Sequence, residues 1–368
     1  GAALGTGDIR VRRGGLEAFC GSVFEHRGMG PGDAAVTAEV LVAADACGIP
    51  SHGVGRLRRY VSGLDTGLML PRETGTTILE SPASLVIDAR GAMGPPVSAR
   101  TMDAVIAKAR ENGAAFGAVR NSNHFGIAGF YARRALSEDM LGIAMTNTAA
   151  LGVPTFGREA FFGTNPIAFA APAGEEGAFV LDMSTTVVTR GKVEVYERKG
   201  GELPEGWAVD HTGKTARDPG SLLEGMQERR GGGILPLGGL DTLLGGHKGY
   251  GLAVMVDILC AVLSGGPFGR DVYDTPESSA RVSHFFGAIR IDRFRDPGEF
   301  RADMDRMLRD LRACPPAEGR DRVWFAGLPE AEAERESGRR GVPLSRKTWE
   351  VLRDLAAETG IGLPQEIL

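Results

Sequence analysis

The stretch AAFGAVRNSNHFGIAGFYARRALSEDMLGIAM, residues 114–145, decides the fold class. Residues 114–119 are predicted to form a buried strand, residues 127–136 a helix and residues 141–145 a second strand. The polar turn 121–126 joins the first strand to the helix. Strands that alternate with helices over such short distances indicate an α/β protein.

The sequence around this stretch predicts further strands in the middle of the chain and helices towards both ends. The remaining predicted strands cover residues 76–79, 85–87, 167–171, 178–181, 285–291 and 323–325. The remaining predicted helices cover residues 16–24, 31–46, 97–109, 190–198, 249–263, 299–311, 330–335 and 346–359, and one more that begins at an N-cap residue, Ser51. Residues 199–245 are rich in Gly and Pro and are predicted to be loop.

The length of 368 residues exceeds what one hydrophobic core usually serves, which predicts two domains. Chain ends often lie close together. We therefore expect a helical domain built from both chain ends, residues 1–72 and 298–368, beside a mixed α/β domain, residues 73–297.

Charge and cysteine content exclude several classes of protein. The 42 basic and 47 acidic residues give a net charge of −5, so a nucleic-acid partner is not expected. The longest apolar stretch, residues 252–263, contains Asp257 and is too short to cross a bilayer. Residues 1–13 lack the apolar region of a signal peptide. The four cysteines have no zinc-binding spacing, which predicts no metal site and favours free thiols in the cytoplasm.

The segment Ser51-His52-Gly53-Val54-Gly55-Arg56 is the first candidate for chemistry. With Ser51 as the N-cap, His52 and Arg56 share one helix face because they are four residues apart. A histidine can transfer a proton, and the forked guanidinium of an arginine binds carboxylates well. The segment therefore suits a substrate with a carboxylate beside the reacting carbon. An ordinary helix start with solvated arginines also explains the pattern.

Two glycine-containing turns lie ahead of predicted helices. Residues 121–129 include His124 and Gly126, and residues 245–251 include Lys248. The N-terminus of a helix attracts anions through its free N–H groups and its dipole. Both turns therefore suit a phosphate group, although a simple turn or hinge explains each of them as well.

Small polar residues gather at predicted strand ends in three other segments. These are Thr146-Asn147-Thr148, Gly163-Thr164-Asn165-Pro166 and Leu181-Asp182-Met183-Ser184. Such groups commonly line ligand clefts, and an acidic residue at a strand end can accept hydrogen bonds from ribose hydroxyls. Caps and turns remain an alternative explanation for all three.

No dinucleotide-binding G-x-G-x-x-G sequence is present, and the looser match at residues 30–35 follows a helix instead of a strand. In their order along the chain, however, the motifs resemble the malate/L-lactate dehydrogenase family, which lacks a Rossmann fold. That family also includes L-sulfolactate, ureidoglycolate and diketogulonate oxidoreductases and piperideine-2-carboxylate reductases. The resemblance covers roughly residues 8–345 and rests on residues 43–45, 51–60, 121–126, 146–148, 162–166, 181–184, 204–207 and 246–251.

The resemblance implies a mixed-sheet, non-Rossmann nicotinamide-binding domain in a homodimeric enzyme. Such an enzyme moves a hydride between NAD or NADP and a 2-oxo acid or a related imine. By the same resemblance, Ser51 orients His52, which donates a proton to the carbonyl oxygen. Arg56 holds the substrate carboxylate, Thr164 is a further substrate contact and His124 is a second active-site histidine. The implied cofactor contacts are His124, Gly126, Thr148, Asp182, Met183, Ser184, His247 and Lys248.

Two positions depart from the family pattern. Ala326-Gly327-Leu328 stands where relatives often carry Pro-Gly-Glu at a cofactor contact, which leaves the choice between NAD and NADP open. Lys192 stands where piperideine-2-carboxylate reductases carry an acidic residue, so we favour a 2-oxo acid reductase over an imine reductase. A catalytically silent nucleotide-binding relative is a third interpretation. The joint retention of five site residues argues against it, namely Ser51, His52, Arg56, His124 and Lys248.

The expected place of His52 at a helix N-terminus has a consequence for its charge. The helix dipole and Arg56 are both positive there, so the imidazole should resist protonation. A bound substrate carboxylate would offset both. We therefore expect substrate binding itself to charge His52.

Overall fold

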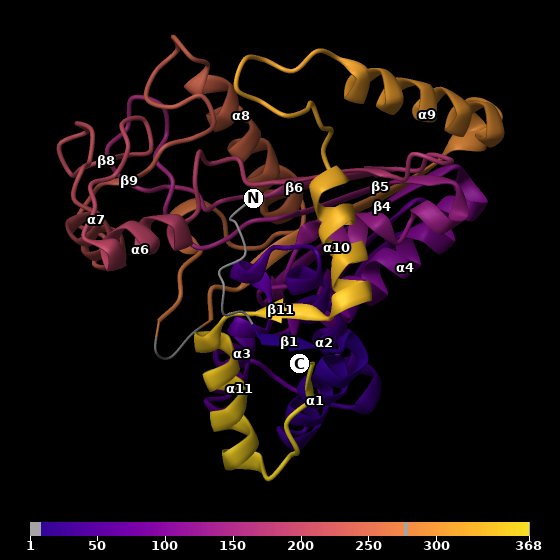
Figure 1. The fold of residues 1–368 in the computed structure, drawn as a ribbon, viewed down its shortest axis with the longest axis horizontal. Helices are drawn as coiled ribbons and strands as arrows, with labels where there is room; N and C mark the ends of the chain where they lie inside the picture. Colours follow the sequence, from indigo (N-terminus) through magenta and orange to yellow (C-terminus); the bar gives the residue numbers. More distant parts are fainter. Residues whose placement is uncertain (1–8, 276–278, 368) are drawn as a thin grey trace.

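The computed structural model describes residues 9–275 and 279–367, and it shows an α/β architecture around one large sheet (Figure 1). Residues 1–8, most of the segment in which no signal peptide is expected, lie outside the described residues. Within the described ranges, no helix is long and apolar enough to cross a membrane.

The large sheet has seven strands in the order β2-β3-β4-β10-β5-β6-β7. Its strands are β2 (Thr76–Ser81), β3 (Ser84–Asp88), β4 (Ala114–Ser122), β5 (Met140–Thr146), β6 (Ile167–Ala171), β7 (Phe179–Met183) and β10 (Val282–Arg290). Only β3 and β4 are parallel neighbours, joined by the crossover helix α4 (Gly94–Asn112), and all other neighbours are antiparallel. The sheet is therefore mixed, as predicted, and differs from the parallel sheet of a Rossmann domain.

Helices cover both faces of the large sheet (Figure 1). On one face, α4 and α5 (Ala128–Arg133) bury Met102 and Tyr131 against strand residues such as Phe286. The 3₁₀ turn η3 (Leu136–Glu138) follows α5 and leads into β5.

Two helical segments cover the opposite face. The helix α8 (Gly246–Asp257) continues as a π-turn, η4 (Ile258–Val262), and buries Val256 and Cys260 against β4, β5 and β10. The helix α9 (Pro297–Ala313) packs over β5, β6 and β7. α10 (Leu328–Arg340) begins beside α9 and runs back towards the chain ends.

A second core joins the two ends of the chain. The strand β1 (Ile9–Val11) pairs antiparallel with both β11 (Val342–Leu344) and β12 (Glu366–Ile367). Around this small sheet pack α1 (Arg13–His26), α2 (Pro31–Ala46), α3 (Leu57–Asp65) and α11 (Arg346–Thr359). The domain boundaries given above stay a prediction, and α9, inside the expected C-terminal part, packs on the large sheet.

A separate small core lies under the segment between β7 and α8. It contains α6 (Arg190–Lys199), α7 (Pro219–Gln227), β8 (Ala208–Val209) and β9 (Gly233–Ile234). The prediction of loop over residues 199–245 is therefore wrong where α7 lies. Its N-cap, Asp218, accepts hydrogen bonds from the N–H groups of Gly220 and Ser221, a signal that the surrounding glycines obscured.

Two further local predictions are wrong. Ser51 does not cap a helix, because two 3₁₀ turns, η1 (Pro50–His52) and η2 (Val54–Arg56), precede α3. Residues 323–325 form no strand. The chain turns at once through Gly327, whose φ is 93°, so the apolar run is too short to pair.

Candidate active site

His52 lies in the loop of two 3₁₀ turns that joins α2 to α3. Its Nδ1 is 2.9 Å from the hydroxyl oxygen of Ser51, and Arg56 Nε donates a 2.8 Å hydrogen bond to the Ser51 carbonyl. Both His52 and Arg56 are half-buried. The loop thus brings together the imidazole and guanidinium grouped by their spacing, although they do not lie on a helix.

His124 stacks on His52, with ring centroids 5.6 Å apart and an interplanar angle of 25°. Its Nδ1 lies 2.7 Å from the buried hydroxyl of Tyr60 and accepts a 3.3 Å hydrogen bond from the Gly126 N–H. Because a backbone N–H only donates, we assign the proton of the neutral His124 ring to Nε2. Gly126 has a φ of 85°, and a Cβ there would lie 2.3 Å from Val40, so this turn requires glycine.

Both stacked histidines are neutral near pH 7. Burial, and then the charge of Arg56, lower the pKa of His52 to about 4. Burial, followed by the charges of His52 and Arg56, holds the pKa of His124 well below its ordinary value. From the sequence, the dipole of a helix was expected to be one cause of a low pKa of His52. Because His52 lies in a loop and not at a helix N-terminus, the dipole does not act on it, and burial is the main cause of the low pKa.

Charged residues of both signs surround Arg56. Its pKa is lowered first by burial and then by the charge of Arg59, and Arg190 of α6 acts in the same direction. Glu194 of α6 opposes them and forms a 3.0 Å ion pair with Arg190. Lys192, at the position that differs from the imine reductases, is exposed, and its side chain makes no hydrogen bond or ion pair within the described ranges.

The two threonines predicted to line the site meet each other. Thr148 Oγ1 accepts a 2.9 Å hydrogen bond from the Thr164 N–H and lies 3.3 Å from the Thr164 hydroxyl. A Cβ on Gly163 would lie 2.0 Å from Thr148 Oγ1, so this approach of the two segments requires glycine. Both threonines are half-buried.

Asp182 at the end of β7 accepts a 2.7 Å hydrogen bond from the Gly129 N–H in the first turn of α5. Part of the Asp182 side chain is exposed to solvent. Protein atoms nevertheless crowd around the carboxyl group, and this burial raises the pKa of Asp182 to about 6. The charge of Glu330 raises that pKa further. The neighbouring Met183 and Ser184 are half-buried, and the Ser184 hydroxyl donates to a nearby backbone carbonyl.

His247 and Lys248 lie exposed in the first turn of α8, after Gly245 with its φ of 85°. Neither side chain has a hydrogen bond or ion pair with any residue the structure describes. The contacts therefore join Ser51, His52, Arg56 and His124 into one group and pair Thr148 with Thr164. They do not link the start of α8 to either set.

His284 was not predicted as a site residue, because it lies in the apolar strand β10 and no motif surrounds it. It is fully buried, and its ring stacks on Phe125 with centroids 4.6 Å apart. Its Nε2 lies 2.7 Å from the Ser122 hydroxyl and its Nδ1 lies 2.8 Å from the Thr146 hydroxyl. It thus ties the turn that holds His124 to the strand end that leads to Thr148.

A family model described as malate/L-lactate dehydrogenase matches residues 11–353. The chain belongs to the malate/L-lactate dehydrogenase family. It is 41% identical over 353 residues to a malate dehydrogenase of Pyrococcus abyssi, covering 96% of each chain. It is 37% identical to an L-sulfolactate dehydrogenase of Methanocaldococcus jannaschii, covering 91% of this chain and 93% of the relative. The solved malate dehydrogenase of Entamoeba histolytica superposes with a TM-score of 0.93 at 32% identity, covering 97% of this chain and all of that one.

The protein is therefore an enzyme of the 2-hydroxy acid dehydrogenase type, and its family implies a nicotinamide cofactor. The residues around Asp182 fit such a cofactor. Glu330 Oε2 is buried and has no hydrogen-bond partner among the described residues, and it lies close enough to Asp182 to raise its pKa. Two carboxylates with unused acceptor capacity suit the hydroxyl groups of a ribose.

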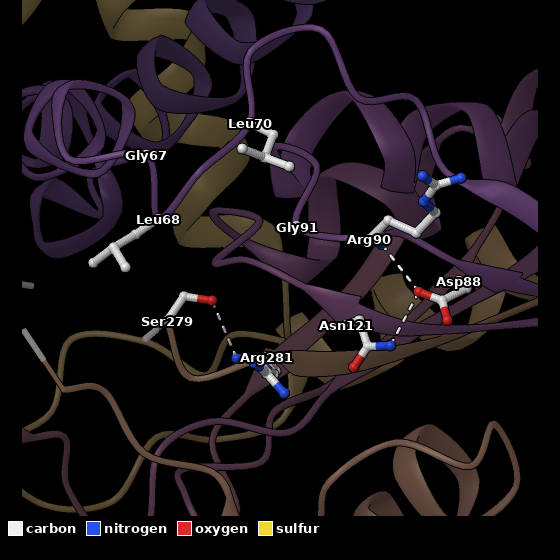
Figure 2. Close-up of a pocket in the computed structure, with 9 residues that line it drawn as sticks. All are labelled: Gly67, Leu68, Leu70, Asp88, Arg90, Gly91, Asn121, Ser279 and Arg281. Carbon is white, nitrogen blue, oxygen red and sulfur yellow. Dashed lines mark hydrogen bonds between the residues drawn. The ribbon is translucent and has the colours of Figure 1, made fainter. Parts of the chain in front are cut away.

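This dehydrogenase also has a pocket of about 410 Å³ at the ends of β3 and β4 (Figure 2). Its lining includes Asp88, Arg90, Asn121 and Arg281, and Asp88 accepts hydrogen bonds from the Arg90 N–H and the Asn121 amide. None of the residues assigned a catalytic or cofactor role lines it. The site residues expected from the sequence therefore lie outside this pocket.

Proposed function

We propose that this dehydrogenase interconverts a 2-oxo acid with a second anionic group and the matching 2-hydroxy acid, using NAD or NADP. The observation that supports this most is the stack of two neutral histidines beside Arg56. The malate and sulfolactate dehydrogenases among its relatives act on acids that carry such a second anion.

Arg56 binds the carboxylate next to the reacting carbon. Its guanidinium is half-buried and donates through Nε to the Ser51 carbonyl, which fixes its plane and leaves its terminal nitrogens for a bidentate contact. Arg59 and Arg190 also lie close enough to affect Arg56, and each is paired with a carboxylate, that of Asp274 and that of Glu194. The preference for a dianionic substrate therefore rests on the malate and sulfolactate dehydrogenases among the relatives.

The neutral His52 ring carries its proton at Nδ1 and donates it to the Ser51 hydroxyl oxygen, which leaves the lone pair of Nε2 for the substrate. That hydroxyl accepts from the Nδ1–H of the neutral ring and of the charged ring alike, so Ser51 supports both protonation states. The neutral ring accepts the proton of a hydroxy acid. When an oxo acid binds, its carboxylate favours the charged ring, which then protonates the carbonyl oxygen.

His124 stays neutral in this scheme and donates a hydrogen bond from Nε2. Burial, followed by the charges of His52 and Arg56, holds the pKa of His124 well below its ordinary value, and a charged ring would place an Nδ1–H against the Gly126 N–H, with the Tyr60 hydroxyl left as its acceptor. The Nδ1 of His52 faces a hydroxyl without such an opposing donor, so the acid-base role is assigned to His52. His124 instead orients the substrate oxygen.

The nicotinamide cofactor, when bound, supplies or accepts the hydride. The chain holds it through Asp182 and Glu330, whose acceptor capacity is noted above. Its other contacts, by the family pattern, are His124, Gly126, Thr148, Met183, Ser184, His247 and Lys248.

We also infer that the enzyme is a homodimer. Met255, Ile258 and Val262 lie on one face of α8 and η4 and are exposed, together with Leu263. An apolar helix face of this kind usually marks a protein contact. Sedimentation of the wild type should give a dimer, and Ile258→Asp should shift it towards the monomer. A monomeric wild type would contradict the inference.

A substrate panel tests the proposed reaction. Oxidation of NADH and NADPH is followed by the absorbance of the reduced nicotinamide with oxaloacetate, pyruvate and a cyclic imine carboxylate. We expect the highest kcat/KM with oxaloacetate and a lower value with pyruvate, because pyruvate lacks the second anion. Faster turnover of the imine would support the imine reductase alternative. Cofactor binding without turnover of any substrate would support the silent relative.

A further inference from the structure

Asp45 lies directly beneath the loop that carries His52 and Arg56. It is the penultimate residue of α2, and its side chain is only 4% exposed. Its Oδ2 accepts a 2.6 Å hydrogen bond from the Val54 N–H, the one side-chain hydrogen bond it makes within the described ranges. A Cβ on Gly53 would lie 2.2 Å from both carboxylate oxygens, so the loop backbone rests against the carboxyl group itself.

This contact falls at the joint between the two 3₁₀ turns. The first turn closes through the bond from the His52 N–H to the Ile49 carbonyl, and the second through the bond from the Arg56 N–H to the Gly53 carbonyl. The first turn therefore fixes the backbone at His52, and the second turn fixes the backbone at Arg56. The angle between the turns, and with it the placement of imidazole against guanidinium, depends on the joint that Asp45 holds.

We propose that Asp45 is a positioning residue for the reaction, which sets His52 and Arg56 relative to each other through the backbone at Gly53 and Val54. This rests on the proposed function only in that His52 and Arg56 act on one substrate. Within the described residues, the Asp45 side chain makes no hydrogen bond to His52 or Arg56. Its effect on the placement of these two side chains therefore runs through the loop backbone.

The burial of Asp45 supports this assignment. A carboxyl group removed from water is costly unless it is well bonded, and burial raises the pKa of Asp45 to about 7 even with the Val54 N–H bond present. The charge of Asp45 also raises the pKa of the buried Cys20 thiol on α1, after the effect of burial itself. Within the described residues, the hydrogen bond that the Asp45 side chain makes is the one from the loop, so the loop is what this buried acceptor serves.

The test compares Asp45→Ala, which removes the acceptor, with Asp45→Asn, which keeps one. The matched control is Ser337→Ala. It deletes a buried 3.0 Å hydrogen bond to the Ala46 carbonyl at the end of the same helix, a bond that involves neither Gly53 nor Val54. We expect Asp45→Ala to lower kcat/KM for the oxo acid by about 30-fold, the order expected for a misplaced catalytic group. Cofactor Kd should hold within about twofold, Asp45→Asn should recover most of the loss, and Ser337→Ala should match the wild type.

A readout independent of turnover accompanies the kinetics. In protein labelled with ¹⁵N-histidine, the His52 ring signals are assigned from their loss in His52→Gln. They should shift in Asp45→Ala and stay in place in Ser337→Ala. A shift in an enzyme that turns over no substrate of the panel would support the positioning role while the proposed reaction fails.

Other outcomes would overturn the proposal. Unchanged His52 signals and unchanged kcat/KM in Asp45→Ala would do so, and so would an equal loss in Ser337→Ala, which would indicate general destabilisation. If Asp45→Ala does not fold, Gly53→Ala takes its place, because its Cβ would push the loop off an intact Asp45. It should give the same loss of kcat/KM with cofactor affinity retained, and wild-type kinetics would refute the role.

Discussion

Replacing His284 by asparagine should change how the stability of the enzyme depends on pH. The folded protein keeps the pKa of this buried imidazole at about 3, chiefly through burial, against an ordinary value of 6.5. Between pH 6.5 and pH 3, the unfolded chain therefore binds a proton at His284 that the folded chain does not bind. The stabilising contribution is complete above pH 6.5 and is lost as the pH falls towards 3.

The magnitude follows from the difference between the two pKa values. Lowering the pH from 8 to 5 should cost the wild type about 2 kcal/mol through His284 alone, at about 1.4 kcal/mol per unit below 6.5. The asparagine variant carries no such titration. It should be less stable than the wild type by roughly 2 to 4 kcal/mol at pH 8, because it loses the stack on Phe125 and weakens the bonds to Ser122 and Thr146. By pH 5 that gap should narrow by about 2 kcal/mol.

Urea unfolding of both proteins across this pH range, followed by circular dichroism at one protein concentration, measures the gap. His211→Asn serves as the control, because it removes a histidine that is exposed instead of buried. A difference in the free energy of unfolding between wild type and His284→Asn that is the same at pH 8 and pH 5 would refute the reasoning. It would mean that the imidazole is not held neutral by its burial.

Three further predictions concern the reaction itself. His52→Gln should lower kcat by about 10³-fold with cofactor Kd nearly unchanged, as measured by steady-state kinetics and fluorescence titration; retained turnover would remove His52 from the acid-base role. Arg56→Lys should raise KM for oxaloacetate by about 10-fold or more, because a lysine cannot make the bidentate contact, and an unchanged KM would contradict the carboxylate site. Burial raises the pKa of Asp182 to about 6, so cofactor affinity should weaken as the pH falls through 6 and the carboxylate is protonated, whereas Asp182→Asn should bind independently of pH.

Much of the fold could be predicted from the sequence because its elements are long or strongly apolar. The bounds predicted for α2, β6 and α11 agree with the structure to the residue. The strands β1 and β11 could not be predicted, because each has only three residues and forms only when chain segments more than 300 residues apart meet. No local pattern reports such a pairing.

The site was predictable where chemistry follows from spacing along the chain. His52 and Arg56 are four residues apart, so any turn-like backbone brings them together. The stack of His124 on His52 depends on how β4 and the α2–α3 loop pack, which no spacing reveals. Asp45 and His284 are single polar residues within apolar segments, and only burial and their partners distinguish them from ordinary core positions.

We infer that His52 is neutral in the free enzyme and becomes charged when a carboxylate binds beside it. Calorimetric titration of the enzyme, loaded with reduced cofactor, with oxamate near neutral pH in buffers of different ionisation enthalpy counts the protons taken up. We predict an uptake of about one proton per site in the wild type and none in His52→Gln. Oxamate binding without proton uptake in the wild type, or equal uptake in both proteins, would contradict the claim.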